Sequence, residues 1–288
     1  MWSSLLSAMR PRQWSKNGLV IVAALTSGDA FELRVWPKVI LAFVIFTSLS
    51  SAMYLINDLC DRKMDANHPK KKNRSIASGE LSPKAALVAA ALLATVGLSA
   101  AFTLSSNSFL IALSYIILTV LYSTKLKLIQ IIEILVVSSG FVLRVIFGAS
   151  VINVPTSIWL GLCIFFGSSM IVVAKRQAEL RLHDKQFVRS VILKYSEKTL
   201  RNTEFFAGLC LLVTYMLWTL FGQEDIYTQR FLLIISSVPF IAGVARFLFV
   251  AQNFGIEEPE EFLISDRIIQ VFGTFFLILL TAGLFINL

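Results

Sequence analysis

The sequence predicts an all-α polytopic membrane protein with nine transmembrane helices. Composition is the first observation: 56% of the 288 residues are hydrophobic and 15% are charged, whereas soluble domains hold roughly 45–50% apolar and about 25% charged residues. The second is that the apolar runs approach the roughly 20 residues that cross a bilayer as a helix. A soluble protein with a very large core would show shorter runs, so the membrane class is favoured.

Nine apolar runs are the predicted spans. They cover about residues 14–30, 36–57, 83–104, 107–123, 130–152, 156–174, 204–221, 231–250 and 268–287. Several runs begin with helix-start signals; Ser82 and Pro83, for example, suit an N-cap and a first helical position. Lys16 and Asn17 interrupt the first run, and residues 2–9 are expected to precede it as a short surface helix.

Basic residues alternate between the loops that join these runs. Every second loop, beginning with the N-terminal segment, is basic, and together these loops hold twenty Lys and Arg residues. The opposite set holds three, namely Arg34, Lys38 and Arg230. The positive-inside rule places the basic set in the cytoplasm. We therefore predict a multi-pass protein of the inner (plasma) membrane with a cytoplasmic N-terminus and an external C-terminus, and, since no internal repeat is visible, a single domain over residues 1–288.

The segment NDLCDRKMD, residues 57–65, directly follows the second run. If that helix continues, Asn57, Asp61 and Asp65 lie on one face because they are spaced at i, i+4 and i+8, and Asp58 lies about 100° round. Mg²⁺ prefers hard oxygen ligands and usually takes one or two carboxylates. The predicted ligands of a magnesium site are therefore Asn57, Asp61 and Asp65. Solvated acids that balance nearby cations are the alternative, although ionisable groups inside a span are costly and tend to be functional.

Basic and polar side chains on the same predicted side of the membrane point to a metal–polyphosphate ligand. The metal would bridge a diphosphate while Arg and Lys bind the remaining oxygens. The candidate substrate-binding residues are Arg10, Arg12, Lys16, Arg74, Tyr122, Lys125, Lys127, Glu133, Arg144, Lys175 and Arg176. Attraction to anionic lipids is the alternative, and it accounts for much of residues 181–201. Over residues 174–200, apolar residues alternate with charges in a pattern that suits an amphipathic interfacial helix.

Arg144 stands about halfway along the fifth run. Charged residues inside spans pair with one another or mark substrate paths. The partner of Arg144 is either a side chain such as Glu133 or an anionic group of a substrate, and the sequence leaves both open.

NDLCDRKMD matches N-D-x-x-D-x-x-x-D, and in this the chain resembles the UbiA-type intramembrane prenyltransferases. Further stretches resemble one branch, the decaprenyl-phosphate phosphoribosyltransferases. These stretches are MRPRQWSKN (9–17), YLINDLCDRKMDANHPKKKNRSIASGEL (54–81), YSTKLKLIQIIEILVVSSGFVLRVIFGA (122–149), AKRQAEL (174–180) and GIEEPEEFLISDR (255–267). They run from one end of the chain to the other, so the resemblance is global.

The resemblance implies a fold: a UbiA-like bundle of nine transmembrane helices with a cytoplasm-facing polar cavity that holds Mg²⁺ and a diphosphate. The cytoplasmic loops 58–82, 175–203 and 251–267 would cap this cavity. The resemblance also implies an activity, in which 5-phosphoribose moves from phosphoribosyl pyrophosphate to polyprenyl (decaprenyl) phosphate and pyrophosphate leaves. This would be a step toward a lipid-linked arabinose donor for cell-wall polysaccharide such as arabinogalactan.

The catalytic residues predicted on this basis are Asp58, Asp61 and Asp65, and two features depart from the wider superfamily. Its second aspartate-rich motif is reduced here to Glu133, and the lysines after Tyr122 fall at +3 and +5 rather than +4. Which of Lys125 and Lys127 reaches phosphate is therefore open. One metal site suffices if basic side chains neutralise the rest of a phosphorylated sugar, so the reduced motif favours phosphoribosyl transfer.

Two other functions share parts of the pattern. An aromatic prenyltransferase that uses polyprenyl diphosphate, as in quinone biosynthesis, would share the first motif but show a fuller second one. A transporter of anionic metabolites would place its site near the midplane, whereas the ionisable residues here gather at one leaflet. The predicted partners are thus phosphoribosyl pyrophosphate, polyprenyl phosphate and membrane lipids, with no nucleic acid, and a homo-oligomer is left open.

Overall fold

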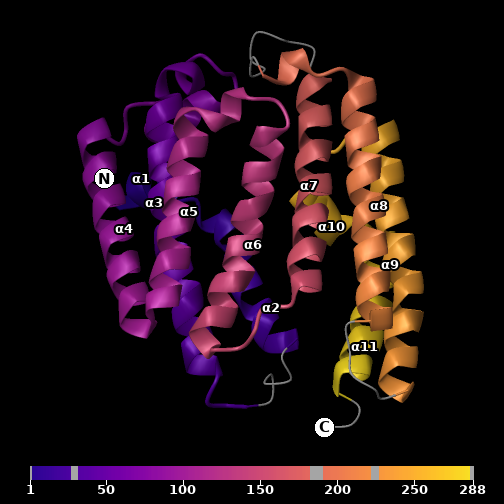
Figure 1. The fold of residues 1–288 in the computed structure, drawn as a ribbon. Helices are drawn as coiled ribbons and strands as arrows, with labels where there is room; N and C mark the ends of the chain where they lie inside the picture. The colour runs from indigo at the N-terminus through magenta and orange to yellow at the C-terminus, as the bar shows by residue number, and fades with distance from the viewer. Residues whose placement is uncertain (1, 27–31, 182–190, 222–226, 286–288) are drawn as a thin grey trace. The chain divides into compact units, whose positions relative to one another are not determined.

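The computed structural model describes residues 2–26, 32–181, 191–221 and 227–285. Every regular element in these residues is a helix (Figure 1), which confirms the predicted all-α class. The chain divides into two compact units, residues 1–156 and 157–288, and each is described by itself. That the two act as a single domain stays a prediction.

The first unit is organised around one long helix, α3, which contacts α1, α2, α4, α5 and α6. Its helices are α1 (Trp2–Ala8), the 3₁₀ helix η1 (Pro11–Gly18), α2 (Leu19–Thr26), α3 (Trp36–Ala66), the 3₁₀ helix η3 (Lys71–Asn73), α4 (Pro83–Leu104), α5 (Ser106–Thr124), the 3₁₀ helix η4 (Leu126–Leu128) and α6 (Ile132–Ile152). The short helix predicted before the first span is therefore present as α1. As predicted, Ser82 caps α4, because its hydroxyl accepts from the backbone N–H of Ala85 at 3.2 Å.

The second unit is built from pairs of neighbouring helices, with α8 packed on α7 and on α9, and α11 packed on α9. Its helices are α7 (Ile158–Leu180), the 3₁₀ helix η6 (Ile192–Lys194), α8 (Glu197–Phe221), α9 (Tyr227–Asn253), α10 (Pro259–Ser265) and α11 (Arg267–Phe285). Of the amphipathic helix predicted over residues 174–200, residues 182–190 lie outside the described part of the chain, residues 174–180 end α7 and residues 197–200 begin α8.

Asp266 begins α11 by accepting hydrogen bonds from the backbone N–H groups of Ile268 and Ile269 at 3.1 and 3.0 Å. Arg246 of α9 donates to the same carboxylate at 2.9 Å, so one side chain joins α9 to the start of α11. The hydrogen bond from Arg246 holds the pKa of Asp266 below its ordinary value of 3.8.

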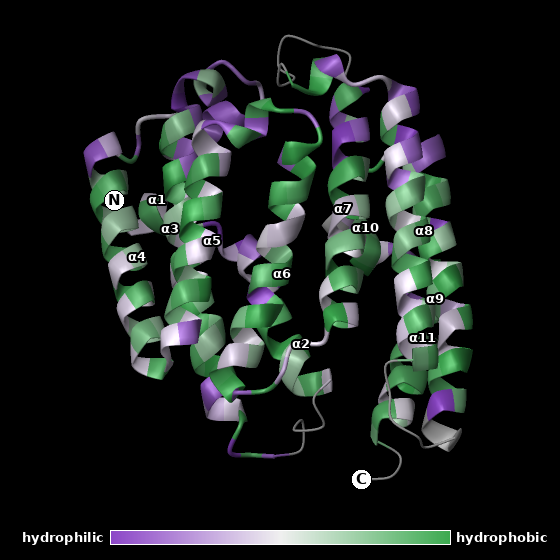
Figure 2. Cartoon of the chain, viewed as in Figure 1, coloured by the Kyte–Doolittle hydropathy of each residue, from purple (hydrophilic) through white to green (hydrophobic). Residues whose placement is uncertain are grey.

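Eight helices in the described residues are long and apolar enough to cross a membrane, namely α3 to α9 and α11. Hydrophobic residues cover most of their length, and hydrophilic residues gather near helix ends (Figure 2). These helices match eight of the nine predicted spans. The first predicted span, about 14–30, coincides with η1 and α2, and residues 27–31 lie outside the description, so a ninth crossing stays a prediction.

The helix α3 continues to Ala66, well past the predicted end of the second span. The condition on which the shared face of Asn57, Asp61 and Asp65 was predicted is therefore met, and the cytoplasmic location of residues 58–82 stays a prediction. The segment contains no Gly or Pro, and Leu59, Arg62 and Met64 are good helix formers. This continuation places the acid motif on a rigid helix.

Aromatic side chains fill the centre of the first unit. Phe46 and Phe147 are fully buried, and their ring centroids lie 5.3 Å apart, while Tyr115 lies 4.7 Å from Phe46. Lipid is as apolar as these side chains, so close packing, rather than exclusion from water, must hold such helices together.

Helix α2 meets α6 at Gly148. A Cβ atom at this position would stand 2.0 Å from the carbonyl oxygen of Val20, so only glycine permits this approach of the two backbones.

Gly148→Ala should lower the stability of the protein by roughly 1–3 kcal/mol, as overpacking commonly does, because the obstructing atoms belong to a backbone and not to a flexible side chain. Gly273→Ala in α11 is the control, since nothing lies within 4 Å of a Cβ there. The stability of both variants is measured in detergent as the temperature at which half of the monodisperse protein is lost. A midpoint for Gly148→Ala equal to that of the wild type would contradict the close packing.

Candidate functional site

The acids at the C-terminal end of α3 are buried. Asp58, Asp61 and Asp65 expose 3%, 4% and 2% of their surface, and the side chains at positions 60 and 62–64 are exposed. The spacing i, i+3, i+7 puts the three carboxylates on one stripe that faces the interior of the unit. Asn57 is half-buried beside this stripe, which agrees with the shared face predicted for Asn57, Asp61 and Asp65, and Asp58 is buried on the same side as well.

Lys127 binds the middle acid of the stripe. Its Nζ donates to Oδ1 of Asp61 at 2.5 Å, and the amide of Asn57 donates to Oδ2 of Asp61 at 3.3 Å. The turn η4 directs Lys127 inward, where it is 8% exposed, whereas Lys125 is exposed. Of the two lysines that the sequence left open, Lys127 is thus the one that reaches the acid motif.

Two arginines bind the outer acids. Arg10, just before η1, donates to Oδ1 of Asp58 at 2.5 Å. Arg74, in the loop after α3, donates to the same oxygen at 3.2 Å and to Oδ2 of Asp65 at 2.6 Å. Arg10 also lies over the ring of Tyr54 at 5.1 Å. The carboxylate of Asp58 therefore joins two segments that are far apart in the sequence.

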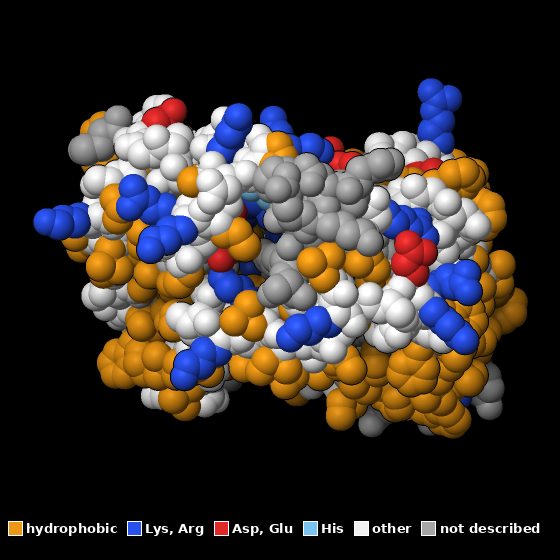
Figure 3. All heavy atoms as spheres, turned by 90° about the horizontal axis from the view of Figure 1, so that it is seen from above, with side chains coloured by type: hydrophobic (Ala, Val, Ile, Leu, Met, Phe, Trp, Pro, Cys, Tyr) orange, Lys and Arg blue, Asp and Glu red, His pale blue; other side chains and the backbone are white. Residues whose placement is uncertain are grey.

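Three cations thus match three buried carboxylates. Burying a carboxylate costs several kcal/mol unless a good partner compensates, so the pairs explain how the acids can lie in the interior. The side chains of Arg10 and Arg74 are 26% and 29% exposed. A guanidinium has five N–H donors, so both arginines can bind an anion as well as their acids. Figure 3 looks at the structure of Figure 1 from above, and many Lys and Arg side chains are visible on the surface that it shows.

Arg144 is buried in α6 among neutral partners. Its Nε donates to Oδ1 of Asn17 at 3.0 Å, Nη1 to the carbonyl oxygen of Gly140 at 2.7 Å and Nη2 to the hydroxyl of Tyr115 at 3.2 Å. Its guanidinium also lies 5.0–5.3 Å from three aromatic ring centroids. Glu133, offered by the sequence as a partner, is not among these described contacts. That Arg144 binds a substrate stays a prediction.

The other predicted residues of the first unit differ in exposure. Arg12 is exposed on η1, Lys16 and Tyr122 are half-buried, and Glu133 is fully buried in the first turn of α6. Their contacts with a substrate stay predictions.

Lys175 and Arg176 belong to α7 in the second unit. Arg176 is 6% exposed and donates to Glu179 at 2.9 Å. Next to them, Gln177 donates to Oε2 of Glu204 in α8 at 2.7 Å. The buried Oε1 of Glu204 has no hydrogen-bond partner among the described residues. This is a polar cluster of its own unit, and its convergence with the acids of α3 stays a prediction.

The acid motif suits a divalent cation in its chemistry. Asn57, Asp61 and Asp65 offer hard oxygen atoms, which Mg²⁺ prefers. In the described residues, however, no group of three or more His, Cys, Asp or Glu side chains is placed to hold a metal ion, and each of the three carboxylates is bonded to a cation. Binding an ion would require Asp61 and Asp65 to give up part of these bonds, so the predicted ligand set stays a prediction.

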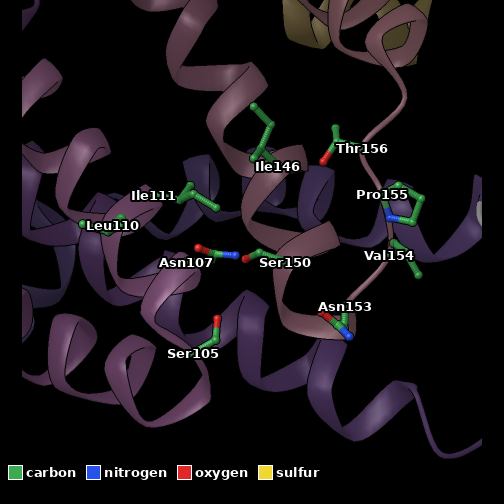
Figure 4. A pocket seen from close by; sticks show the side chains of 10 residues that line it. All are labelled: Ser105, Asn107, Leu110, Ile111, Ile146, Ser150, Asn153, Val154, Pro155 and Thr156. Carbon is green, nitrogen blue, oxygen red and sulfur yellow. The ribbon is translucent and has the colours of Figure 1, made fainter.

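A hollow of about 490 Å³ lies at the other ends of α5 and α6 (Figure 4). Asn107 and Ser150, which line it, point toward one another in this view. None of the residues that line it is charged. A diphosphate would find no counter-charge there, so this hollow does not compete with the acid motif as a site for a phosphorylated donor.

Sequence reasoning did not select Asn17, Tyr115, Ser123 or Glu204. Asn17 and Tyr115 bind Arg144, and the hydroxyl of Ser123 donates to Oδ1 of Asn57 at 3.4 Å. The available signal was that each is a polar residue inside an apolar run, where polar groups seek partners in the protein interior.

Comparisons with known proteins agree with the resemblance seen in the sequence. The model of the UbiA prenyltransferase family matches residues 18–254. The decaprenyl-phosphate phosphoribosyltransferase of Mycobacterium tuberculosis H37Rv is 33% identical over 275 residues, which cover 93% of this chain and 90% of the relative. The protein of the same name from Corynebacterium glutamicum is 34% identical over 273 residues, covering 93% and 82%.

Solved structures show the same fold at low identity. A UbiA homolog from Archaeoglobus fulgidus bound to GPP and Mg²⁺ is 17% identical, with a TM-score of 0.69 and coverage of 97% of this chain and 98% of that one. A digeranylgeranylglyceryl phosphate synthase gives a TM-score of 0.72 at 18% identity, with coverage of 98% of both chains. The all-helical, UbiA-like fold is therefore established.

Lys127→Met should destabilise the protein by about 3 kcal/mol, because it leaves the carboxylate of Asp61 buried without its cation. Lys125→Met is the matched control, and an exposed change of this kind should stay within about 0.5 kcal/mol of the wild type. Adding Asp61→Asn to Lys127→Met should restore much of the loss, since the buried charge is then gone. Thermal denaturation in one detergent compares all four proteins, and equal midpoints for the two lysine variants would contradict the pairing.

Proposed function

The chain belongs to the UbiA prenyltransferase family and is a transferase, and from this premise we propose that it transfers 5-phosphoribose from phosphoribosyl pyrophosphate to a polyprenyl phosphate. The observation that carries the proposal is the set of three buried acids on α3, each bonded to a basic side chain from another segment. The names of relatives that match 93% of the chain support the same transferred group and the same kind of lipid acceptor.

The charge balance of the site favours a phosphorylated donor bound with additional positive charge. Asp58, Asp61 and Asp65 carry three negative charges and their partners three positive ones, so the cluster by itself offers no excess charge to a pyrophosphate. A divalent cation supplies that excess, as do Arg12 and Lys16 on η1. The site thus fits a metal–pyrophosphate complex better than a bare anion.

Asn57, Asp61 and Asp65 would hold Mg²⁺, which when bound stabilises the charge of the departing pyrophosphate. The solved relative that contains Mg²⁺ supports this choice of ion. Because Lys127 and Arg74 bond to the same carboxylates, the proposal requires these cations to turn toward phosphate oxygens as the acids turn to the ion.

In the transfer, a phosphate oxygen of the lipid forms a bond to the anomeric carbon of the donor. The bond from that carbon to pyrophosphate breaks, and its electron pair leaves with the pyrophosphate. A phosphate monoester is largely dianionic near neutral pH, with a second pKa of about 6, so the nucleophile needs no strong general base. The task of Arg10, Arg74 and Lys127 is to screen the repulsion between the two anions and to hold them in line.

Four further candidates of the first unit would extend this phosphate-binding surface. They are Arg12, Lys16, Tyr122 and Lys125. The distribution of basic residues supports a site that faces the cytoplasm and a chain in the inner membrane. A product made there would serve as a precursor of a lipid-linked arabinose donor for cell-wall polysaccharide.

Purified protein in lipid nanodiscs should move label from radiolabelled phosphoribosyl pyrophosphate into the lipid phase when polyprenyl phosphate and Mg²⁺ are present. Asp61→Ala should lower the rate by roughly 100-fold or more, as removing a main transition-state contact does. Glu80→Gln is the control acid, because Glu80 is exposed in the loop after α3, and it should keep the wild-type rate.

Two results of this assay would contradict the proposal. Near-normal turnover by folded Asp61→Ala would remove the acid motif from the mechanism. Label that stays in the aqueous phase, together with prenyl transfer from polyprenyl diphosphate to an aromatic acid, would replace the proposed reaction with that of an aromatic prenyltransferase.

Metal removal tests the ion separately. Excess EDTA should lower the transfer rate at least about tenfold, and added Mg²⁺ should restore it. Asp65→Asn should raise the Mg²⁺ concentration needed for half-maximal rate by about tenfold or more, while Glu80→Gln should leave it unchanged. A full rate in excess EDTA would show that the acids serve another purpose.

A further inference from the structure

The segment 10–18 lies along one stripe of α3. Its contacts descend that helix in order: Arg10 bonds to Asp58, Trp14 donates to the hydroxyl of Ser51 at 3.1 Å, and Asn17 donates to the hydroxyls of Ser50 and Thr47 at 2.9 and 3.2 Å. Contact positions 47, 51 and 58 recur at intervals of four and seven residues, and position 50 is three residues from 47, so all four lie on one side of α3. The segment, called the N-terminal arm below, therefore runs antiparallel to α3 with the acid motif at one end.

The first residue of the arm, Arg10, has a strained backbone conformation. Arg10 has φ +56° and ψ +66°, a left-handed region that residues other than glycine rarely adopt. Such a conformation persists only where surrounding contacts determine it. The position of the Arg10 guanidinium at Asp58 thus depends on how firmly the rest of the arm is fixed.

The other end of the arm, at Asn17, is fixed by a buried network of hydrogen bonds. Asn17 is fully buried, and its amide links two elements: its NH₂ group donates to α3, and its oxygen accepts from Arg144 of α6. Arg144 in turn donates to Tyr115 of α5 and to the carbonyl oxygen of Gly140. A hydrogen bond to a charged group is stronger than one between neutral groups, so the bond from Arg144 holds Asn17 firmly in place.

We propose that Asn17 and Arg144 form a lock that fixes the N-terminal arm on α3 and thereby positions Arg10 at the acid motif. This gives the buried arginine a positioning role, exerted through Asn17, in place of direct contact with a phosphate. The expected change in the KM for the donor rests on the proposed function. The expected change in the mobility of the arm does not.

The test measures the arm and the reaction separately. Hydrogen–deuterium exchange of the peptide that covers residues 10–18, in nanodiscs, reports on the arm, and steady-state transfer reports KM for the donor and kcat. Asn17→Ala should speed exchange of this peptide about tenfold and raise the donor KM by about tenfold, with a smaller change in kcat. Arg144→Met should do the same, and the double variant should be no worse than either single one, because both changes break one unit.

Two further variants keep the test specific. Asn17→Asp retains an acceptor for Arg144 and can accept from Ser50 and Thr47, so it should restore slow exchange and a low KM. Ser108→Ala is the control, because this buried serine bonds to Ser150 at 2.9 Å between α5 and α6 and has no described contact with the arm. Ser108→Ala should change neither the exchange rate of residues 10–18 nor the KM for the donor.

The outcomes separate the lock from the reaction. Exchange of residues 10–18 that stays slow in both Asn17→Ala and Arg144→Met would overturn the lock. A raised donor KM in Arg144→Met with unchanged exchange would also overturn it, in favour of direct contact between Arg144 and the donor. Faster exchange in both variants, in a protein whose wild type transfers no phosphoribose, would support the lock and reject the proposed function.

Discussion

The burial of three carboxylates at one end of a membrane helix is the constraint on which the rest of the site depends. Asp58, Asp61 and Asp65 lie almost out of contact with solvent, and charges removed from water must be compensated. The compensation comes from Arg10, Arg74 and Lys127, which belong to the N-terminal arm, the loop after α3 and the turn between α5 and α6. Each pair ties a separate segment to α3, so one set of interactions both permits the burial of the acids and assembles the site.

The same pairing bears on function. A stable structure would be served as well by apolar residues, since replacing a buried ion pair with well-packed hydrophobic side chains is often neutral or stabilising. Three adjacent pairs, with both arginines partly exposed, are instead suited to exchanging partners with an incoming cation and a phosphate. The cluster therefore supports the proposed metal-assisted transfer, and the name of the relatives, decaprenyl-phosphate phosphoribosyltransferase, supports the transferred group and the lipid phosphate.

Hydropathy predicted the fold class and eight of the spans because a helix that crosses lipid must be predominantly apolar. The shared face of Asn57, Asp61 and Asp65 followed from their spacing alone. The residue at which α3 ends could not be predicted, because charged residues are found both where a helix ends and where a helix continues beyond the lipid. Which basic residue binds which acid could not be predicted. Lys125 and Lys127 are close in sequence, and it is the conformation of η4 that directs Lys127 inward and leaves Lys125 exposed. The sequence suggested an anionic partner for Arg144, whereas an amide, a phenol, a carbonyl and three rings surround it.

The most direct measurement is an experimental structure of the protein in a nanodisc with phosphoribosyl pyrophosphate and Mg²⁺. The account predicts density for the ion against Asp61, with the pyrophosphate beside it and the side chains of Lys127 and Arg74 turned from their acids toward phosphate oxygens. A donor bound elsewhere, with the pairs of Asp58, Asp61 and Asp65 unchanged, would contradict the claim that these acids form the reaction site.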